Sequence, residues 1–112
     1  MACPALHELP APALVALYRR RVVSPLEVAR AVLGHVERWE QHAHALYLLR
    51  PDQVLEQARA SEARWLRGEP LGLIDGVPVT IKENIATRGD PVPLGTAATE
   101  LAPAAADAPP AA

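Results

Sequence analysis

Apolar residues recur at helical spacing in three stretches of the chain. Leu14, Leu17 and Tyr18 follow one another at i, i+3 and i+4, which predicts a short helix over residues 12–20. A longer apolar stripe begins after residue 24, and a third lies between residues 52 and 67. The pattern therefore predicts three amphipathic helices, each with one face available for packing.

The second and third helices carry recognisable end signals. Ser24 and Glu27 predict a capping box, and Pro25 suits the first helical position between them. We expect this helix to run to about Glu40, and the third helix to end at Gly68. The expected core face of the second helix comprises Ala29, Val32, Leu33 and Val36, with Trp39 closing the stripe. The expected core face of the third comprises Val54, Leu55, Ala58, Trp65 and Leu66.

Two short runs have the character of strands. Residues 45–49 are a brief apolar run between polar loops, and residues 77–81 are dense in β-branched side chains. Asp75 and Gly76 indicate a turn just before the second run, and Pro78 places its start at a sheet edge or a bulge. Together with the helices, these runs predict an α/β fold in which helix predominates.

Composition narrows the class of protein. A length of 112 residues and a net charge of −2 suit one small domain and give no electrostatic basis for binding nucleic acid or an anionic membrane. No apolar run approaches the ~18 residues that span a bilayer. Cys3 has no partner for a disulfide, and residues 1–12 lack the pattern of a secretory signal. We therefore expect a cytoplasmic protein without a membrane span.

Two groups of polar residues suggest chemistry. The first comprises His35, His42 and His44. The second comprises Asp75, Glu83 and Asp90. Three imidazoles can bind zinc, but a polar connection between elements is the favoured interpretation, so we predict neither a metal site nor a cofactor. Turn chemistry and solvated charge are likewise favoured for the carboxylates over acid–base catalysis.

Lys82 is the only lysine among eleven basic residues, and it directly follows the apolar run 77–81. A lysine placed at the end of a buried strand would be desolvated, which favours its neutral amine. A neutral lysine can accept a proton, whereas arginine cannot do so in a protein. A snorkelling surface lysine is the alternative that these facts alone leave open.

The segment 72–84, Gly-Leu-Ile-Asp-Gly-Val-Pro-Val-Thr-Ile-Lys-Glu-Asn, resembles the Gly-x-x-x-Gly-[Val/Ile]-Pro-x-x-[Ile/Val]-Lys-[Asp/Glu]-Asn segment of amidase-signature enzymes. The resemblance implies the N-terminal part of that fold, with three helices packed on two or three strands of an incomplete mixed sheet. It also implies that Lys82 is the base of a Ser–cis-Ser–Lys triad that hydrolyses an amide bond. Gly76, Pro78 and Asn84 would then shape the site, and no cofactor would be needed.

The serines of that triad are absent from this chain. Its only serines are Ser24, interpreted as a helix cap, and Ser61, within the third predicted helix. We therefore expect the N-terminal portion of an amidase domain over residues 1–100 and a truncated tail rich in Ala and Pro over 101–112, inactive alone. The origins considered are a truncated gene product, a mis-split reading frame and one half of a divided protein.

Three functional hypotheses remain at this point. The first is a fragment of an enzyme acting on a small-molecule amide. The second is one component of a split amidase, with a C-terminal partner chain, or of an enzyme resembling the glutamyl-tRNA amidotransferase. The third is a small helical interaction module without catalytic ancestry, in which the segment from Gly76 to Asn84 is accidental.

Overall fold

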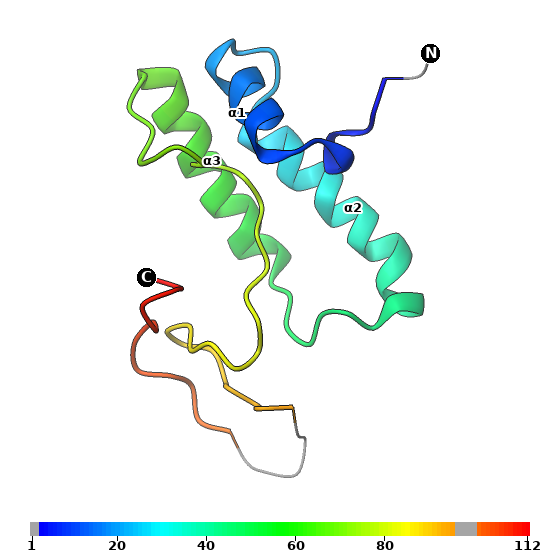
Figure 1. Ribbon diagram of the computed structural model, residues 1–112, viewed down its shortest axis with the longest axis vertical. Helices are drawn as coiled ribbons and strands as arrows, with labels where there is room; N and C mark the ends of the chain where they lie inside the picture. Colours follow the sequence, from blue (N-terminus) through cyan, green and yellow to red (C-terminus); the bar gives the residue numbers. More distant parts are fainter. Residues whose placement is uncertain (1–2, 96–100) are drawn as a thin grey trace. The chain divides into compact units, whose positions relative to one another are not determined.

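Three α-helices and one short 3-10 helix form the regular structure of residues 3–95 and 101–112, which the computed structural model describes. All four lie in the first of two units, Met1–Pro78, and the second unit is Val79–Ala112. In chain order they are η1 (Leu6–Glu8), α1 (Ala11–Arg19), α2 (Pro25–Ala43) and α3 (Pro51–Arg67). The three predicted helices are thus confirmed (Figure 1). The domain boundary expected at residue 100 lies outside the described residues.

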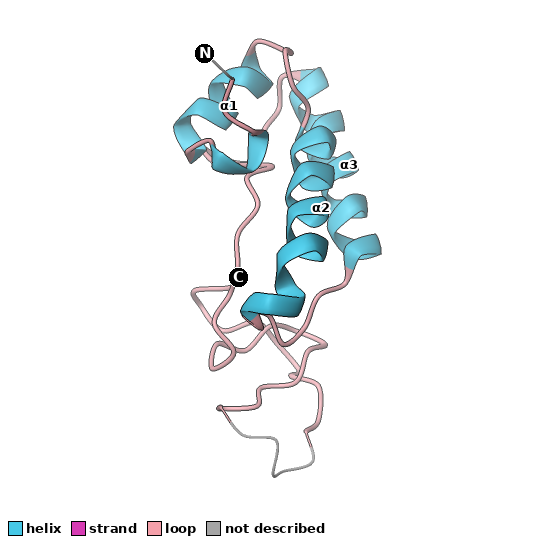
Figure 2. Cartoon of the chain, turned by 90° about the vertical axis from the view of Figure 1, so that its right-hand side faces the viewer, coloured by secondary structure: helices cyan, strands magenta, loops and turns pink. Residues whose placement is uncertain are grey.

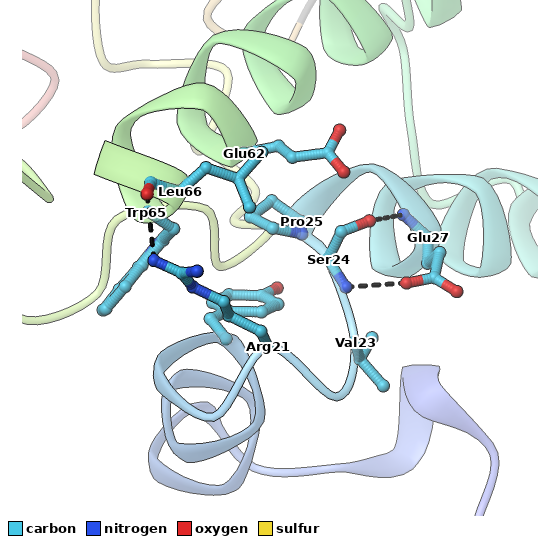
Figure 3. A pocket seen from close by; sticks show the side chains of 9 residues that line it. Arg21, Val23, Ser24, Pro25, Glu27, Glu62, Trp65 and Leu66 are labelled. Atoms are coloured by element: carbon cyan, nitrogen blue, oxygen red, sulfur yellow. Dashed lines mark hydrogen bonds between the residues drawn. The ribbon is translucent and has the colours of Figure 1, made fainter. Parts of the chain in front are cut away.

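The capping box predicted at the start of α2 is present. The Glu27 backbone N–H donates to Ser24 Oγ at 3.1 Å, and the Ser24 backbone N–H donates to Glu27 Oε2 at 2.7 Å (Figure 3). Pro25 occupies the first turn, where its missing N–H costs no helical hydrogen bond. The helix ends at His44, whose φ of 46° lies in the left-handed region.

Helix α3 returns antiparallel alongside α2, and both views show the two helices side by side (Figures 1 and 2). It ends as predicted at Gly68, where a φ of 73° suits glycine because no Cβ opposes it. Its C-terminal turn also receives the guanidinium of Arg21, which donates from Nη2 to the Leu66 carbonyl at 3.0 Å. This contact joins the end of α3 to the loop between α1 and α2.

The core draws on all three α-helices. Its buried cluster comprises Leu14, Val15, Tyr18, Val28 and Trp65. The rings of Tyr18 and Trp65 lie with centroids 5.9 Å apart, so α1 and α3 meet through an aromatic pair. Of the residues expected on the core faces of α2 and α3, only Trp65 belongs to this cluster, and Val32 packs against it. Trp39 is 52% exposed and Leu66 is 56% exposed, whereas Val28, which was not expected on the core face, is fully buried. The helical period was therefore right, but the predicted faces were too wide and missed the centre of the α2 contact.

The predicted sheet is wrong. No strand occurs among residues 3–95 and 101–112, so the architecture of the described chain is helical instead of α/β (Figure 2). An extended run becomes a strand only when another strand receives its backbone hydrogen bonds, and neither 45–49 nor 77–81 forms such a ladder with a described segment. In the first run, the Leu46 amide donates instead to the Glu40 carboxylate, at 2.7 Å.

The second unit consists of turns with a single isolated bridge among its described residues. This parallel bridge pairs Arg88 with Ala104, and the Gly89 amide donates to the Ala104 carbonyl at 2.8 Å. The Asp107 carboxylate accepts a hydrogen bond from the Arg88 amide at 2.6 Å. These contacts hold the described end of the chain against the loop that follows Lys82 in sequence. In the described parts of both units, no helix is long and apolar enough to cross a membrane.

Candidate functional site

The turn that precedes the motif lysine is tied to α3 through one carboxylate. Asp75 Oδ1 accepts hydrogen bonds from Ser61 Oγ at 2.8 Å and from Arg64 Nη2 at 2.7 Å. Asp75 Oδ2 accepts from Arg64 Nε at 2.7 Å and from the Leu71 amide at 2.9 Å. The Arg64 guanidinium therefore binds the carboxylate with both prongs of its fork, which is the strongest geometry for this pair.

The backbone of the same turn is held by two aromatic side chains. Trp65 Nε1 donates to the Asp75 carbonyl at 3.0 Å, and the Tyr18 hydroxyl donates to the next carbonyl, that of Gly76, at 2.9 Å. Two successive peptide groups are thus fixed from α3 and from α1. We call the four side chains that hold the turn, those of Tyr18, Ser61, Arg64 and Trp65, the anchor cluster.

Gly76 is enclosed so closely that only glycine fits. A Cβ built at this position would lie 2.5 Å from Ser61 Oγ and 2.8 Å from Pro25 Cγ. Its φ of 85° also lies in the left-handed region, which strains any residue with a side chain. The start of α2 and the middle of α3 therefore press on the turn from two sides.

Electrostatics strengthen the attachment. The side chain of Asp75 is only 5% exposed and that of Arg64 is 23% exposed. Hydrogen bonds from Arg64 lower the pKa of Asp75 to about 2, aided by the Leu71 amide and the Ser61 hydroxyl, while burial acts in the opposite direction. The Asp75 carboxylate in turn raises the pKa of Arg64. Burial raises the pKa of Tyr18 to about 12, so its hydroxyl stays protonated and donates to Gly76.

The structure distributes the predicted site residues between the two units. Gly76 and the half-buried Pro78 end the first unit. Lys82 and Asn84 are both exposed in the second. The carbonyl of Lys82 accepts a hydrogen bond from the Ile85 amide at 3.0 Å, so the lysine begins a turn instead of ending a paired strand.

Neither serine of the chain is available as a nucleophile. Ser24 Oγ accepts the capping hydrogen bond of α2. Ser61 is buried, with 2% of its surface exposed, and its hydroxyl proton is directed at Asp75. A serine that attacks a carbonyl must present its oxygen to substrate beside a base, and neither environment allows this.

The histidines do not gather around a common point. His35 stacks on His7 with ring centroids 4.0 Å apart, and His42 lies edge-on against Trp39. His44 caps the end of α2. Among the described residues, no group of three or more His, Cys, Asp or Glu side chains could hold a metal ion.

The three carboxylates considered for acid–base chemistry have separate roles. Asp75 belongs to the first unit, whereas Glu83 and Asp90 belong to the second. Asp75 is saturated by the donors described above, and Asp90 accepts a hydrogen bond from the Thr87 hydroxyl at 2.8 Å. The Asp75 carboxylate is therefore committed to structure and is not free to exchange a proton near neutral pH.

A small cavity of about 100 Å³ opens near the anchor cluster, between the end of α1, the start of α2 and the end of α3 (Figure 3). Its polar lining includes Arg21, Ser24, Glu27 and Glu62. Three of these already bond to the protein, since Arg21 binds the Leu66 carbonyl and the Ser24–Glu27 pair forms the capping box. The cavity therefore offers little free chemistry to a ligand.

Comparison with known proteins decides the family. A family model described as "Amidase" matches residues 27–110, a range that includes Gly76, Pro78, Lys82 and Asn84. The chain belongs to the amidase family. No solved structure matches it. Membership of this family confirms the resemblance drawn from the segment 72–84.

Similar curated proteins carry the name of a glutamyl-tRNA(Gln) amidotransferase subunit. The one from Gloeobacter violaceus is 43% identical over 68 residues, covering 61% of this chain and 14% of that protein. Those from Trichormus variabilis and Salinispora arenicola are 37% identical over 68 residues and 36% identical over 91 residues. The Salinispora match covers 81% of this chain and 18% of its relative. The chain thus spans less than a fifth of the length of these relatives.

Sequence reasoning missed the anchor cluster. It treated Asp75 as a turn residue, which is correct, but it did not connect that turn to α3. A usable signal existed in the sequence. Ser61, Arg64 and Trp65 share one face of a helix at i, i+3 and i+4, and this helix directly precedes the turn in sequence. A polar pair on an otherwise apolar helix face indicates a buried acceptor, and Asp75 is the nearest carboxylate of the following turn.

Proposed function

We propose that this chain supplies the proton-accepting lysine of an enzyme that hydrolyses amide bonds by a Ser–cis-Ser–Lys mechanism. The observation that carries the proposal is the family match over residues 27–110, which contains Lys82 within the segment Gly76–Asn84. Lys82 is also the only side-chain amine of the chain. The ten arginines cannot take the role that this chemistry gives to a neutral lysine, because a guanidinium stays protonated in a protein.

In this mechanism the Lys82 amine takes a proton from a bridging serine, which in turn deprotonates the nucleophilic serine. The nucleophile attacks the amide carbonyl, and backbone N–H groups stabilise the oxyanion that forms. The proton then passes to the leaving amine, and water releases the acyl group from the serine. Gly76, Pro78 and Asn84 shape the path of the chain around the base.

The two serines must come from a segment beyond these 112 residues, because Ser24 and Ser61 are both committed to structure. The same segment has a second task. Lys82 is exposed in the chain alone, and a base that activates a serine works best in an enclosed site where its neutral form is favoured. Packing of the serine-bearing segment over Lys82 would provide that enclosure.

The test is a chimaera in which this chain replaces the matching segment of the Gloeobacter violaceus relative, assayed for ammonia release from simple primary amides. Lys82→Arg keeps the charge but cannot accept a proton, and Lys82→Met keeps the length. Both should lower kcat/KM by about a thousandfold or more. Arg88→Met, which removes an exposed cation of the same unit, serves as the matched control and should leave turnover unchanged. Turnover by the Lys82→Arg enzyme near the unsubstituted rate would refute the proposal.

A second candidate follows from the names of the relatives, which are 34% to 43% identical to parts of this chain. The same lysine chemistry would then release ammonia for transfer to a glutamyl-tRNA, with further protein chains as partners. The two candidates differ in one observable. If the chimaera forms amidated glutamyl-tRNA only when the other chains of the transferase are present, the result supports the transferase. If the chimaera releases ammonia at the same rate with and without those chains, the result supports a free-standing amidase.

The family match removes a requirement of the interaction-module hypothesis. It required the segment from Gly76 to Asn84 to be accidental, whereas the family match extends through that whole segment. The enclosure of Gly76 adds a physical argument. The packing around this motif position admits only glycine, so the identity of the residue there is not accidental.

A further inference from the structure

The anchor cluster acts on the stretch of backbone that immediately precedes the motif lysine. Its four side chains bind the Asp75 carboxylate, the Asp75 carbonyl and the Gly76 carbonyl. Two of these three acceptors belong to the main chain. A cluster that served only to pair charges would need the carboxylate alone, so the pattern indicates control of backbone direction.

The contacts define orientation as well as place. Because a peptide group is planar, a hydrogen bond to its carbonyl oxygen restrains the orientation of the whole group. Trp65 fixes the peptide that joins Asp75 to Gly76, and Tyr18 fixes the peptide that joins Gly76 to Val77. Ser61 and Pro25 also lie close to Gly76 on two sides, so the turn is restrained by packing as well as by these hydrogen bonds.

The chemistry chosen is also costly for stability alone. A buried ion pair loses the hydration of both partners, and apolar residues of similar volume often stabilise a fold as well or better. Arg64 and Asp75 nevertheless occupy a position next to the apolar core that contains Trp65. Directional bonds provide what apolar packing does not, namely one fixed geometry for the turn.

We propose that Tyr18, Ser61, Arg64 and Trp65 are positioning residues, which set the direction in which the chain leaves Gly76. The inference rests on the proposed function, because it is the catalytic use of Lys82 that makes this direction matter. These residues act through the backbone and do not touch the substrate. Their part is to define the backbone conformation at Gly76, six positions before Lys82 in the sequence.

The most informative variant is Arg64→Lys. Lysine keeps the positive charge opposite Asp75 but loses the two-pronged geometry, so it separates direction from charge. Arg67→Lys is the matched control, because Arg67 lies on the same helix and forms an exposed ion pair with Glu69. Ser61→Ala removes a single hydrogen bond and should show the same effect to a smaller degree.

The first measurement is amide hydrogen exchange by NMR on the 112-residue chain. The reporters are the Leu71 amide, bound to Asp75, and the Val77 amide, bound to the Ile74 carbonyl at 3.0 Å. Arg64→Lys should raise the exchange rate at both amides by about tenfold or more, while the exchange rates of α2 amides stay within about twofold of wild type. Arg67→Lys should leave the exchange rates unchanged at all of these amides. Unchanged rates at both reporters, or an equal rise along every helix, would show that the cluster does not fix the turn.

The second measurement uses the chimaera of the proposed function. A positioning role predicts that Arg64→Lys lowers kcat by about tenfold while KM stays within about twofold, since the substrate contacts are intact. Equal kcat values for Arg64→Lys and Arg67→Lys would overturn the positioning role even if exchange at Leu71 had risen. No turnover by the unsubstituted chimaera would refute the proposed function and its catalytic use of the turn, while hydrogen exchange would still decide separately whether the cluster fixes the backbone.

Discussion

Replacing Asp75 by Asn tests whether the ion pair stabilises the first unit as its geometry implies. The substitution keeps the size of the side chain and removes the charge. Arg64 then faces an amide, whose NH₂ group cannot accept from either of the two guanidinium donors now 2.7 Å from the carboxylate. Since the Asp75 side chain is only 5% exposed, water cannot readily replace the lost acceptor.

The magnitude follows from the pKa of Asp75, which the Arg64 hydrogen bonds lower from 3.8 to about 2. One pKa unit corresponds to about 1.4 kcal/mol, so ionisation of this carboxylate contributes about 2 kcal/mol to the free energy of unfolding. Because the pKa is lower in the folded state, this contribution is fully present above about pH 4 and is lost as the pH falls through about 2. Asp75→Asn should cost about 3 kcal/mol at pH 7 and only about 1 kcal/mol near pH 2.

Urea unfolding followed by the fluorescence of Trp65 measures this difference at a series of pH values. A Trp39→Phe background removes the other indole, which is 52% exposed and lies outside the core. Glu69→Gln is the control, because its ion pair with Arg67 is exposed on both sides and should contribute less than about 0.5 kcal/mol. If Asp75→Asn cost no more than Glu69→Gln, or if its cost were the same at pH 7 and pH 2, the account of this ion pair would be wrong.

Three further substitutions test the surrounding contacts, each by urea unfolding. Gly76→Ala should cost about 3 kcal/mol or more because the added Cβ meets Ser61 and Pro25 at a positive φ, whereas Gly72→Ala, in open space, should cost less than about 0.5 kcal/mol. Tyr18→Phe should cost about 1 kcal/mol, and it should remove the phenol that titrates near pH 12 in an absorbance titration. Ser24→Ala should cost about 1 kcal/mol, and a negligible change would contradict the capping box.

The helices could be predicted because their signals are local. Ser24, Pro25 and Glu27 lie within one turn and satisfy one another without help from the rest of the fold. Gly68 ends α3 for an equally local reason, its positive φ. How wide a helical face becomes buried depends instead on what packs against it, which explains why Trp39 and Leu66 were placed in the core and are exposed.

The two predicted strands were wrong because local sequence does not decide whether an extended run finds a partner. The β-branched run 77–81 fits a pleated surface, but β propensity mostly reports packing against neighbouring strands. A strand also needs a partner for its backbone groups, and no described segment of this chain is that partner. Residues 45–49 show the same effect, since the amide of Leu46 is satisfied by a side chain of α2.

The prediction for the site combined a family resemblance with an expectation about local structure. Gly76 shows how the role implied by the resemblance differs from the role seen in the structure. The motif suggested that this glycine shapes a catalytic site near Lys82. The structure gives it a nearer reason, since Ser61 and Pro25 occupy the space of its Cβ and Tyr18 binds its carbonyl. A family motif can thus be constrained by packing on its N-terminal side and by chemistry on its C-terminal side. If so, Gly76→Ala should slow the chimaera because the chain leaves the turn in another direction. Lys82→Arg should lower kcat/KM by about a thousandfold or more while the anchor cluster stays intact.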